Sequence, residues 1–161
     1  MTRGAMANPE DKTFHCDLID PTGKLLDCQA TSVVLPAHDG QRGILCDHVP
    51  MLCQLGLGTM KVTPAGTSQY SETAPAQGGA AGQNDLFFFI DGGCALVAQN
   101  TVTVIAYDAM PLQDVKAEQI KSMIDKTAQN ATNPALSSQQ RAHESERLRA
   151  LQRIAEARQG G

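Results

Sequence analysis

The sequence lacks several features that would place it in a common class of protein. No apolar run in its 161 residues approaches the roughly 20 residues that a membrane-spanning helix needs. Residues 1–12 have no apolar core of the kind found in a signal peptide, so we expect neither insertion into a bilayer nor export from the cytoplasm. The Lys and Arg residues do not gather into a stripe with interleaved aromatic residues, so nucleic acid is not an expected partner.

Motifs of catalysis are missing as well. The sequence contains no phosphate-binding glycine loop, no nucleophile elbow, no HExxH helix and no dinucleotide fingerprint. The aspartates that might pair as an acid and a base lie in predicted turns, where Asp is common for conformational reasons. We therefore expect a protein that is not an enzyme by itself, has no catalytic residues and uses no cofactor.

The cysteines show no paired spacing and are odd in number. They are Cys16, Cys28, Cys46, Cys53 and Cys94. This pattern favours small hydrophobic residues buried in the strands of a reduced protein. The alternative is a metal site made of Cys46, His48 and Cys53, with or without His38, although it would lack the paired second half of a zinc motif. Our interpretation contains no metal.

The first two thirds of the chain carry the period of β-strands. Phe14, Cys16 and Leu18 alternate with His15 and Asp17, which predicts a half-buried strand in which His15 is only solvated. Residues 20–23 have the composition of a turn, and a long strand or pair of strands follows from Lys24 to Leu35. Further elements are predicted as a strand end at 33–36, strands at 43–46, 51–55 and 58–64, a flexible insertion at about 65–85, a core strand at 86–90, a turn or bulge at 91–93, and a hairpin of 94–98 with 101–107.

The period changes to that of a helix at Pro111. Apolar residues then recur at three- and four-residue spacing from Ala117 to Ala131, and Asn133-Pro134 ends this helix. Ser137 and Gln140 have the spacing of a capping box that opens a second helix. Its apolar stripe is thin (Leu148, Leu151 and Ala155), so we expect it to dock weakly.

The sequence thus predicts a mainly β protein with an α appendix. A flexible N-terminus (1–12) precedes an N-terminal antiparallel β-sandwich (13–110), and a C-terminal two-helix hairpin (111–158) follows. The net charge also differs between the two parts of the chain: it is −6 for residues 1–111 and +2 for residues 112–161. A mildly basic tail suits an acidic partner surface.

Two blocks of sequence resemble one family. The first block, residues 31–62, contains Val-Val-Leu-Pro, an acidic-glycine loop, Gly-Ile-Leu and His-Val-Pro, followed by a glycine-containing strand. The second block, residues 89–106, contains an apolar strand, a double glycine and two strands joined by a turn. In this order the blocks resemble the N-terminal domain of the epsilon subunit of bacterial F-type ATP synthases. The resemblance extends over nearly all of residues 13–158.

The resemblance implies a non-catalytic rotor subunit of the central stalk. Its partners would be the gamma subunit, the membrane c-ring and the alpha and beta catalytic subunits, at the cytoplasmic side of the inner membrane as a peripheral protein. It would couple proton transport to ATP synthesis, and its C-terminal helices would inhibit ATP hydrolysis. The alternative is a stand-alone β-sandwich binding module with a helical oligomerisation tail.

The resemblance also implies site residues. Two loops would face the rotor ring and the foot of gamma from the same end of the sandwich, with His38, Asp39, Gln41, Arg42 and His48 as contacts. For His48 the other interpretation is a ring that only packs within its tight corner. Arginines of the second helix would engage the catalytic subunits or form a solvated face, and these are Arg141, Arg147, Arg149, Arg153 and Arg158.

A nucleotide motif of the family is degenerate here. Some bacterial members bind ATP through I/L-D-x-x-R-A, and the matching residues are 112–117 of this chain. Gln113 replaces the aspartate and Lys116 replaces the arginine, whose planar fork lysine does not reproduce. We expect weak ATP binding or none.

Overall fold

The computed structural model describes residues 12–65 and 85–159. The predicted flexible terminus and nearly all of the predicted insertion lie outside the described residues. The chain divides into two compact units, one ending at Pro111 and one beginning at Leu112. The described strands of the first unit are β1 (Phe14–Asp20), β2 (Gly23–Ala37), β3 (Gly40–Leu45), β4 (Met51–Pro64), β5 (Leu86–Ala98), β6 (Thr101–Ala106) and β7 (Ala109–Pro111).

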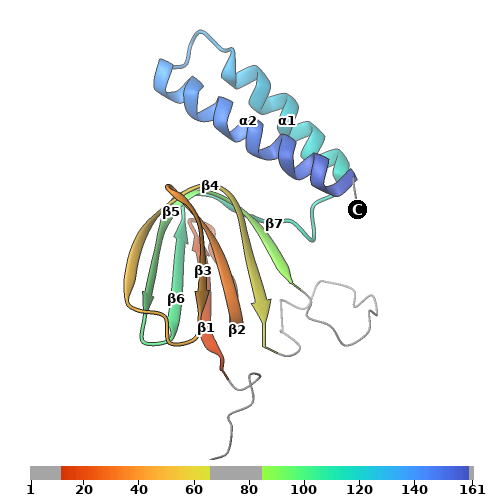
Figure 1. Ribbon diagram of the computed structural model, residues 1–161. Helices are drawn as coiled ribbons and strands as arrows, with labels where there is room; N and C mark the ends of the chain where they lie inside the picture. Colours follow the sequence, from red (N-terminus) through yellow and green to blue (C-terminus); the bar gives the residue numbers. More distant parts are fainter. Residues whose placement is uncertain (1–11, 66–84, 160–161) are drawn as a thin grey trace, which may run out of the picture. The chain divides into compact units, whose positions relative to one another are not determined.

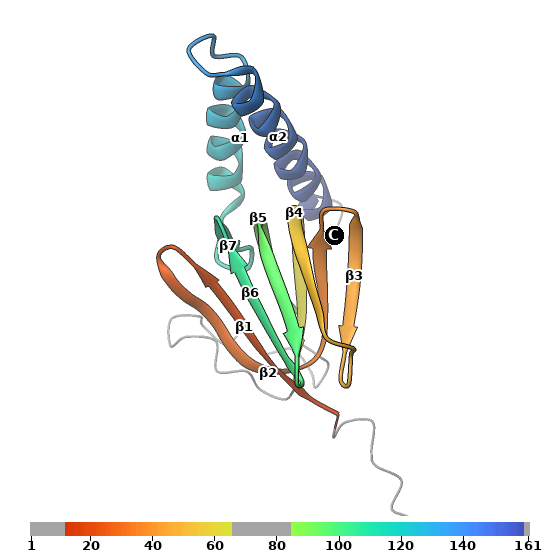
Figure 2. The ribbon, with the colours of Figure 1, turned by 90° about the vertical axis from the view of Figure 1, so that its left-hand side faces the viewer.

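The strands form one sheet that closes on itself. Its order is β1-β6-β5-β4-β2-β3, β7 pairs with β5, and a further pairing of β1 with β2 completes the closure. Figures 1 and 2 show the sheet curling so that its two halves face each other, which confirms the predicted β-sandwich. One pair departs from the predicted antiparallel arrangement, because β1 runs parallel to β6. The two strands are far apart in sequence, so no tight turn forces them to be antiparallel.

The core follows the alternation of the strands. In β1 the side chains of Phe14, Cys16 and Leu18 are buried, and the intervening residues are partly exposed. The phenylalanine-rich strand is nearly buried on both sides, as predicted, since Phe88 and Phe89 are buried. Phe87 is the exception, with 40% of its surface exposed.

The strand end predicted at residues 33–36 is confirmed to within one residue, since β2 ends at Ala37. The break predicted in the next strand is wrong, because that strand continues through its glycines. The two strands expected on either side of Gly56 and Gly58 are one long strand, β4. A Cβ at Gly58 would lie 2.8 Å from Pro36 Cβ, so glycine here lets β4 pass close to the proline instead of turning away.

Gly92 and Gly93 bend β5 and let it change partners. Residues 88–90 of β5 pair with β7, and residues 93–98 pair with β6. Both glycines have positive φ (71° and 122°), which a residue with a side chain rarely adopts. A Cβ at Gly93 would lie 2.1 Å from the Ile105 carbonyl oxygen. The predicted turn or bulge is therefore a bend inside a continuous strand.

The second unit is a helical hairpin of α1 (Ala117–Ala131) and α2 (Ser138–Gln159). The helix predicted from Pro111 begins only at Ala117, because Pro111 belongs to β7 and lies opposite Phe88. Proline is tolerated at the edge of a sheet, where its missing N–H is not needed. The capping box of α2 is confirmed: Ser137 N donates to Gln140 Oε1 (3.0 Å) and Gln140 N donates to Ser137 Oγ (3.2 Å).

We predict that Gly93→Ala lowers the free energy of unfolding by at least about 2 kcal/mol, because it adds a backbone clash to a strained φ. Gly43→Ala is the matched control, since a Cβ there meets no atom within 4 Å and its φ lies outside the left-handed region. We expect that control to change stability by less than about 0.5 kcal/mol. Urea unfolding followed by circular dichroism measures both, and equal stability of the two variants would contradict the bend.

Candidate partner-binding surfaces

The turn between β2 and β3 brings together four of the predicted contact residues. Ala37 lies opposite Gly40, so His38 and Asp39 form a two-residue hairpin turn, with Gly40 at a φ of +133°. Arg42 donates to Asp39 across the turn (Nη2 to Oδ2, 2.5 Å), and this hydrogen bond lowers the pKa of the Asp39 carboxyl. Gln41 is exposed beside them. The hairpin therefore presents a compact polar tip on a rigid edge.

An open groove lies beside this hairpin. It has a volume of about 370 Å³ and is lined by His38, Asp39 and Arg42 from the hairpin and by residues 51–54 from β4. The backbone N–H of His38 donates to the Gln54 carbonyl (2.9 Å), which fixes the hairpin against β4. The groove combines charged groups on one wall with Met51 and Leu52 on the other, a lining suited to a protein side chain.

The corner between β3 and β4 is held by Asn100. The Asp47 N–H donates to Asn100 Oδ1 (2.7 Å), and Asn100 Nδ2 donates to Asp47 Oδ1 (3.0 Å). His48 Nδ1 donates to the carbonyl of its neighbour Val49 (2.8 Å), so the ring is held within the corner. Val49 itself is 71% exposed. The corner is a fixed protrusion with an apolar tip.

His48 does not lie at the same end as the hairpin turn. β3 runs from Gly40 to Leu45, with the His38–Asp39 turn at its start and the Asp47–Val49 corner beyond its end (Figure 2). A strand of this length spans about 20 Å. The expectation that both loops face the same end is wrong, because a single extended strand joins them.

The structure exposes an apolar surface that sequence reasoning missed. Leu52 of β4 pairs with Leu96 of β5, and Cys94 of β5 pairs with Ile105 of β6. All four side chains are exposed, Leu52 by 71%, Leu96 by 49% and Ile105 by 51%. We call these four residues the outer apolar face. In β5, apolar residues occupy both alternating positions around Cys94 and Leu96, so no polar period marks the outward side. In β6, Thr101 and Thr103 do mark the outward side, but Ile105 breaks that alternation.

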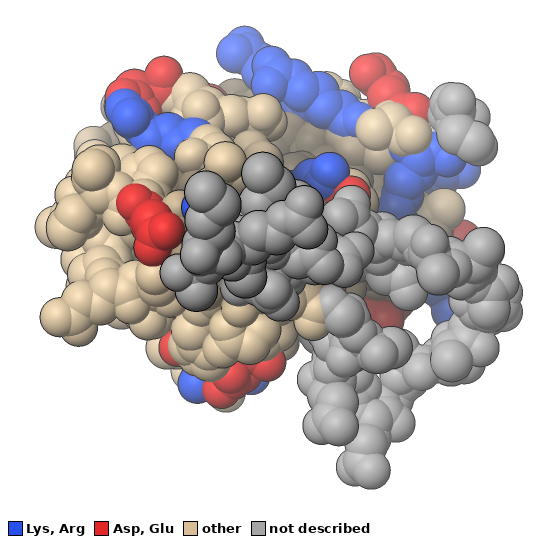
Figure 3. Space-filling model, turned by 60° about the horizontal axis from the view of Figure 1, so that its bottom comes forward, with Lys and Arg blue, Asp and Glu red and all other residues tan. Residues whose placement is uncertain are grey.

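Charged groups are sparse on one side of the sandwich. In Figure 3, which brings the bottom of the molecule forward, most of the described surface of the sandwich carries neither basic nor acidic side chains. The charges that are visible form small separate groups. An uncharged surface with exposed large apolar residues is typical of a protein-binding site.

The arginines of α2 divide into two kinds. Arg149 and Arg153 are exposed, while Leu151 and Ile154 between and beside them are buried. Arg158 donates to the carbonyl oxygens of residues 112 and 115, ahead of α1. It therefore ties the end of α2 to the start of the helical unit. Arg141 and Arg147 are partly exposed. The predicted stripe is shifted, since Ile154 is buried more deeply than Ala155 or Leu148.

Comparison with known proteins places the chain in a family. Residues 13–112 match the family model described as ATP synthase, Delta/Epsilon chain, beta-sandwich domain. The chain belongs to this family. It is 30% identical over 112 residues to the ATP synthase epsilon chain of Jannaschia sp., covering 70% of this chain and 72% of that one. It is 28% identical over 120 residues to the chloroplastic epsilon chain of Chlamydomonas reinhardtii, covering 73% of this chain and 76% of that one.

A solved structure shares the fold of this epsilon-family chain. The match is to a chain in the Euglena gracilis mitochondrial ATP synthase, with a TM-score of 0.65 and 16% identity, covering 98% of this chain and 88% of that one. Identity at this level shows the fold alone.

The positions of the degenerate nucleotide motif in this family member lie ahead of α1. Gln113 and Lys116 are both exposed. The Lys116 N–H donates to Gln119 Oε1 (2.8 Å), so the segment is used to cap the helix. Arg158 contacts two carbonyl oxygens of the same segment.

The described residues do not support the alternative metal site. Cys46 Sγ lies 3.6 Å from the Thr13 carbonyl oxygen and 3.7 Å from Asn100 Oδ1, and His48 contacts its own neighbour. Cys46, His48 and Cys53 do not form a group with metal-binding geometry within residues 12–65 and 85–159. The cysteines are free thiols. Cys16 is buried, Cys28, Cys46 and Cys53 are partly exposed and Cys94 is exposed, so the expectation that all of them are buried is confirmed for Cys16 alone.

We predict that Asn100→Gly lowers the free energy of unfolding by about 1–2 kcal/mol, because it removes two hydrogen bonds to Asp47. Asn100 has a φ of 54°, which glycine adopts easily, so the backbone itself is not strained by the change. Gln99→Gly is the control, since Gln99 has a similar φ of 50°. Urea unfolding should show less than about 0.5 kcal/mol for the control. Equal losses in both variants would mean that the Asn100 amide does not hold the corner.

Proposed function

We propose that this chain is the epsilon subunit of the central stalk of a bacterial F-type ATP synthase. The observation that carries the proposal is the outer apolar face, on a sandwich that matches the delta/epsilon family over residues 13–112. A monomeric surface rarely leaves large apolar side chains exposed on neighbouring strands without a partner. The subunit has no catalytic role of its own: it connects the gamma subunit to the membrane c-ring, so that proton-driven rotation reaches the catalytic alpha and beta subunits.

The outer apolar face is the proposed docking surface for gamma. Its residues lie on β4, β5 and β6, three strands joined by continuous ladders, so the surface is rigid before binding. Burying one leucine removes roughly 1.5–3 kcal/mol of unfavourable hydration, although the ordering of the two partners offsets part of that gain. A pre-ordered surface of this kind transmits torque with little deformation.

The two polar loops serve different contacts in this proposal. Because the hairpin turn and the corner lie at opposite ends of β3, only one of them faces the ring. The corner, with Val49 exposed at its tip, is the proposed contact with the c-ring. His38, Asp39, Gln41 and Arg42 at the hairpin border the groove beside β4 and are the proposed polar contacts with gamma.

The helical hairpin is the proposed regulatory element. In α2, Leu151 and Ile154 are the only described side chains that are fully or nearly buried, and much of the helix surface is polar. Few buried apolar contacts make an element easy to displace. Exposed Arg149 and Arg153 then provide positive charge for acidic surfaces of the catalytic subunits, and contact with them restrains ATP hydrolysis.

The subunit is proposed to lie at the cytoplasmic side of the inner membrane, bound through its partners. Among the described residues, neither helix has the length and apolarity to span a bilayer. A stand-alone binding module, in which the outer apolar face pairs with a second copy of this chain, is the competing function. It predicts a stable homo-oligomer that does not bind the other subunits.

We predict that Leu96→Glu weakens binding of the full chain to an alpha, beta and gamma complex by at least about tenfold, because it buries a charge in the interface. Leu96 is 49% exposed, so the fold tolerates the change. Phe87→Glu is the matched control, on the same strand and 40% exposed but outside the outer apolar face, and we expect a change below about twofold. Isothermal titration calorimetry measures all three chains.

Sedimentation of the same proteins separates the two functions. A wild-type chain that forms a homo-oligomer, loses it in Leu96→Glu and never binds the complex would favour the stand-alone module. Equal binding by Leu96→Glu and the wild type would reject the outer apolar face as the docking surface.

We predict that a chain carrying Arg149→Glu and Arg153→Glu binds the complex normally but restrains ATP hydrolysis at least about fivefold less than the wild type, because charge complementarity is reversed. A chain with Lys121→Glu and Lys126→Glu, which reverses two exposed charges of α1, is the control. Steady-state ATP hydrolysis by a complex lacking epsilon, titrated with each chain, provides the measurement. Restraint that is equally weak in both double variants would show an effect of net charge instead of a specific contact.

A further inference from the structure

Four charged or titratable side chains meet on the outer side of β1 and β2. Asp17 of β1 lies opposite Thr103 of β6, which in turn pairs with Leu96 of the outer apolar face. Asp17 and Asp27 lie directly opposite each other in the antiparallel pair. Two carboxylates in this position repel each other, so a stable sheet needs a cation beside them. His15 of β1 and Lys24 of β2 supply the neighbouring groups.

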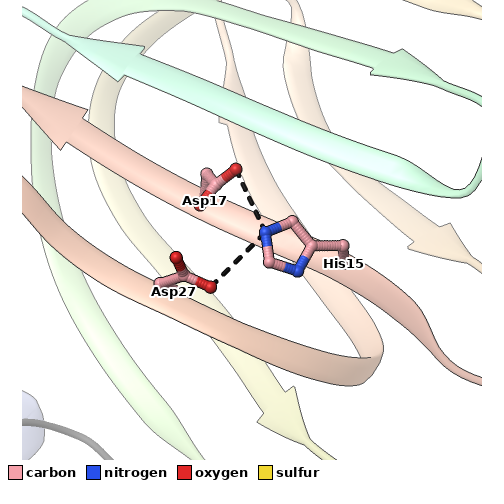
Figure 4. A group of neighbouring side chains, drawn as sticks. All are labelled: His15, Asp17 and Asp27. Atoms are coloured by element: carbon pink, nitrogen blue, oxygen red, sulfur yellow. Dashed lines mark ion pairs between the residues drawn. The ribbon is translucent and has the colours of Figure 1, made fainter.

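In each carboxylate, one oxygen contacts Lys24 and the other faces His15. Lys24 Nζ lies 2.8 Å from Asp17 Oδ1 and 2.8 Å from Asp27 Oδ2. His15 Nε2 faces the remaining oxygens, 3.2 Å from Asp17 Oδ2 and 3.4 Å from Asp27 Oδ1 (Figure 4). Three donor atoms therefore converge on one point while the lysine stays on the other side.

Two of the three separations between these atoms match those around a metal ion. Ligand atoms about 2.0–2.1 Å from a tetrahedral zinc ion lie about 3.3–3.4 Å from one another. The two histidine-to-carboxylate distances are 3.2 and 3.4 Å, and all three donor atoms lie within 4.8 Å of one another. In the described parts of the chain, this is the one His, Cys, Asp and Glu group with such geometry.

The other ring nitrogen of His15 also has a partner. Gln29 lies opposite His15 in the β1–β2 pair, and its side-chain nitrogen is 3.5 Å from His15 Nδ1. A histidine that binds a metal through Nε2 donates its Nδ1–H to an acceptor that fixes the ring. A half-turn of the Gln29 amide presents its oxygen to Nδ1 and supplies that acceptor.

We propose that His15 Nε2, Asp17 Oδ2 and Asp27 Oδ1 form a binding site for a divalent first-row transition metal ion, of which Zn²⁺ is the type. An imidazole nitrogen with only two carboxylates suits such an ion better than Ca²⁺ or Mg²⁺, which take six or more oxygen ligands. Binding leaves the imidazole neutral, with its proton on Nδ1 and its Nε2 lone pair on the metal. Solvent completes the coordination, because the Asp27 side chain is 53% exposed.

The proposal predicts that removing Lys24 strengthens metal binding. Lys24 is a second cation held by the same two carboxylates, and its side chain is 46% exposed. With Lys24 present, the two carboxylates and the lysine carry a net charge of −1. Without Lys24, the net charge is −2. Metal binding should therefore become tighter in Lys24→Met, whereas loss of a ligand should weaken it.

The test uses the purified full chain, titrated with ZnCl₂ by calorimetry and with CoCl₂ by absorption spectroscopy. We expect one site per chain, at least about tenfold weaker in His15→Gln and in Asp27→Asn. We expect it to be tighter in Lys24→Met and unchanged in His143→Gln, which alters an exposed histidine of α2. The Co²⁺ complex should show d–d bands without the near-ultraviolet charge transfer of a thiolate ligand, which separates this site from the free cysteines.

Three results would overturn the site. They are no saturable binding by the wild type, binding that His15→Gln leaves within about twofold, or a thiolate band in the Co²⁺ spectrum. Weaker binding by Lys24→Met would also contradict it, because it would make the lysine a support of the metal instead of its competitor. This test does not measure binding to the other ATP synthase subunits, so its result is independent of whether the proposed function is correct.

Discussion

The close approach of β5 to β6 at Gly93 is the constraint on which the sandwich depends. At that point β5 bends and changes partner from β7 to β6, while β4 follows it along nearly its whole length. A side chain at Gly93 would collide with the Ile105 backbone. One bend therefore lets β5 pair with β7 before the glycines and with β6 after them, and the exposed Cys94 and Leu96 of the outer apolar face follow directly.

Local features of the fold were predictable from the sequence because local chemistry determines them. The alternation in residues 14–19 indicated β1, the turn at residues 20–23 is stabilised by Asp20, and the capping box marked the start of α2. Strand bends and the start of the first helix were less accessible. Pro111 fits either a helix start or a sheet edge by its own properties, and only the pairing of β7 with β5 distinguishes the two.

The surfaces depended on register, which a single sequence does not contain. The exposure of the polar residues in the hairpin turn agrees with their position in a loop on a rigid scaffold, and their role as partner contacts stays a prediction. The sequence does not predict the outer apolar face, since apolar residues occupy both sides of β5 around Cys94 and Leu96, and Ile105 is the one apolar residue on the outward side of β6. The prediction that His15 is only solvated is wrong, because Asp27 reaches His15 through the pairing of β1 with β2, which the sequence alone does not contain.

Because β1 pairs with β6, the sheet cannot close during synthesis until β6 has been made. One edge of β1 pairs with β2, which follows it directly in the chain, but its other edge pairs with Thr101–Ala106, which is synthesised much later. At about 5–20 residues per second, translation leaves that edge open for several seconds. An unpaired strand edge is a template for pairing with other chains. The nascent chain is therefore the state in which this protein has most need of a chaperone.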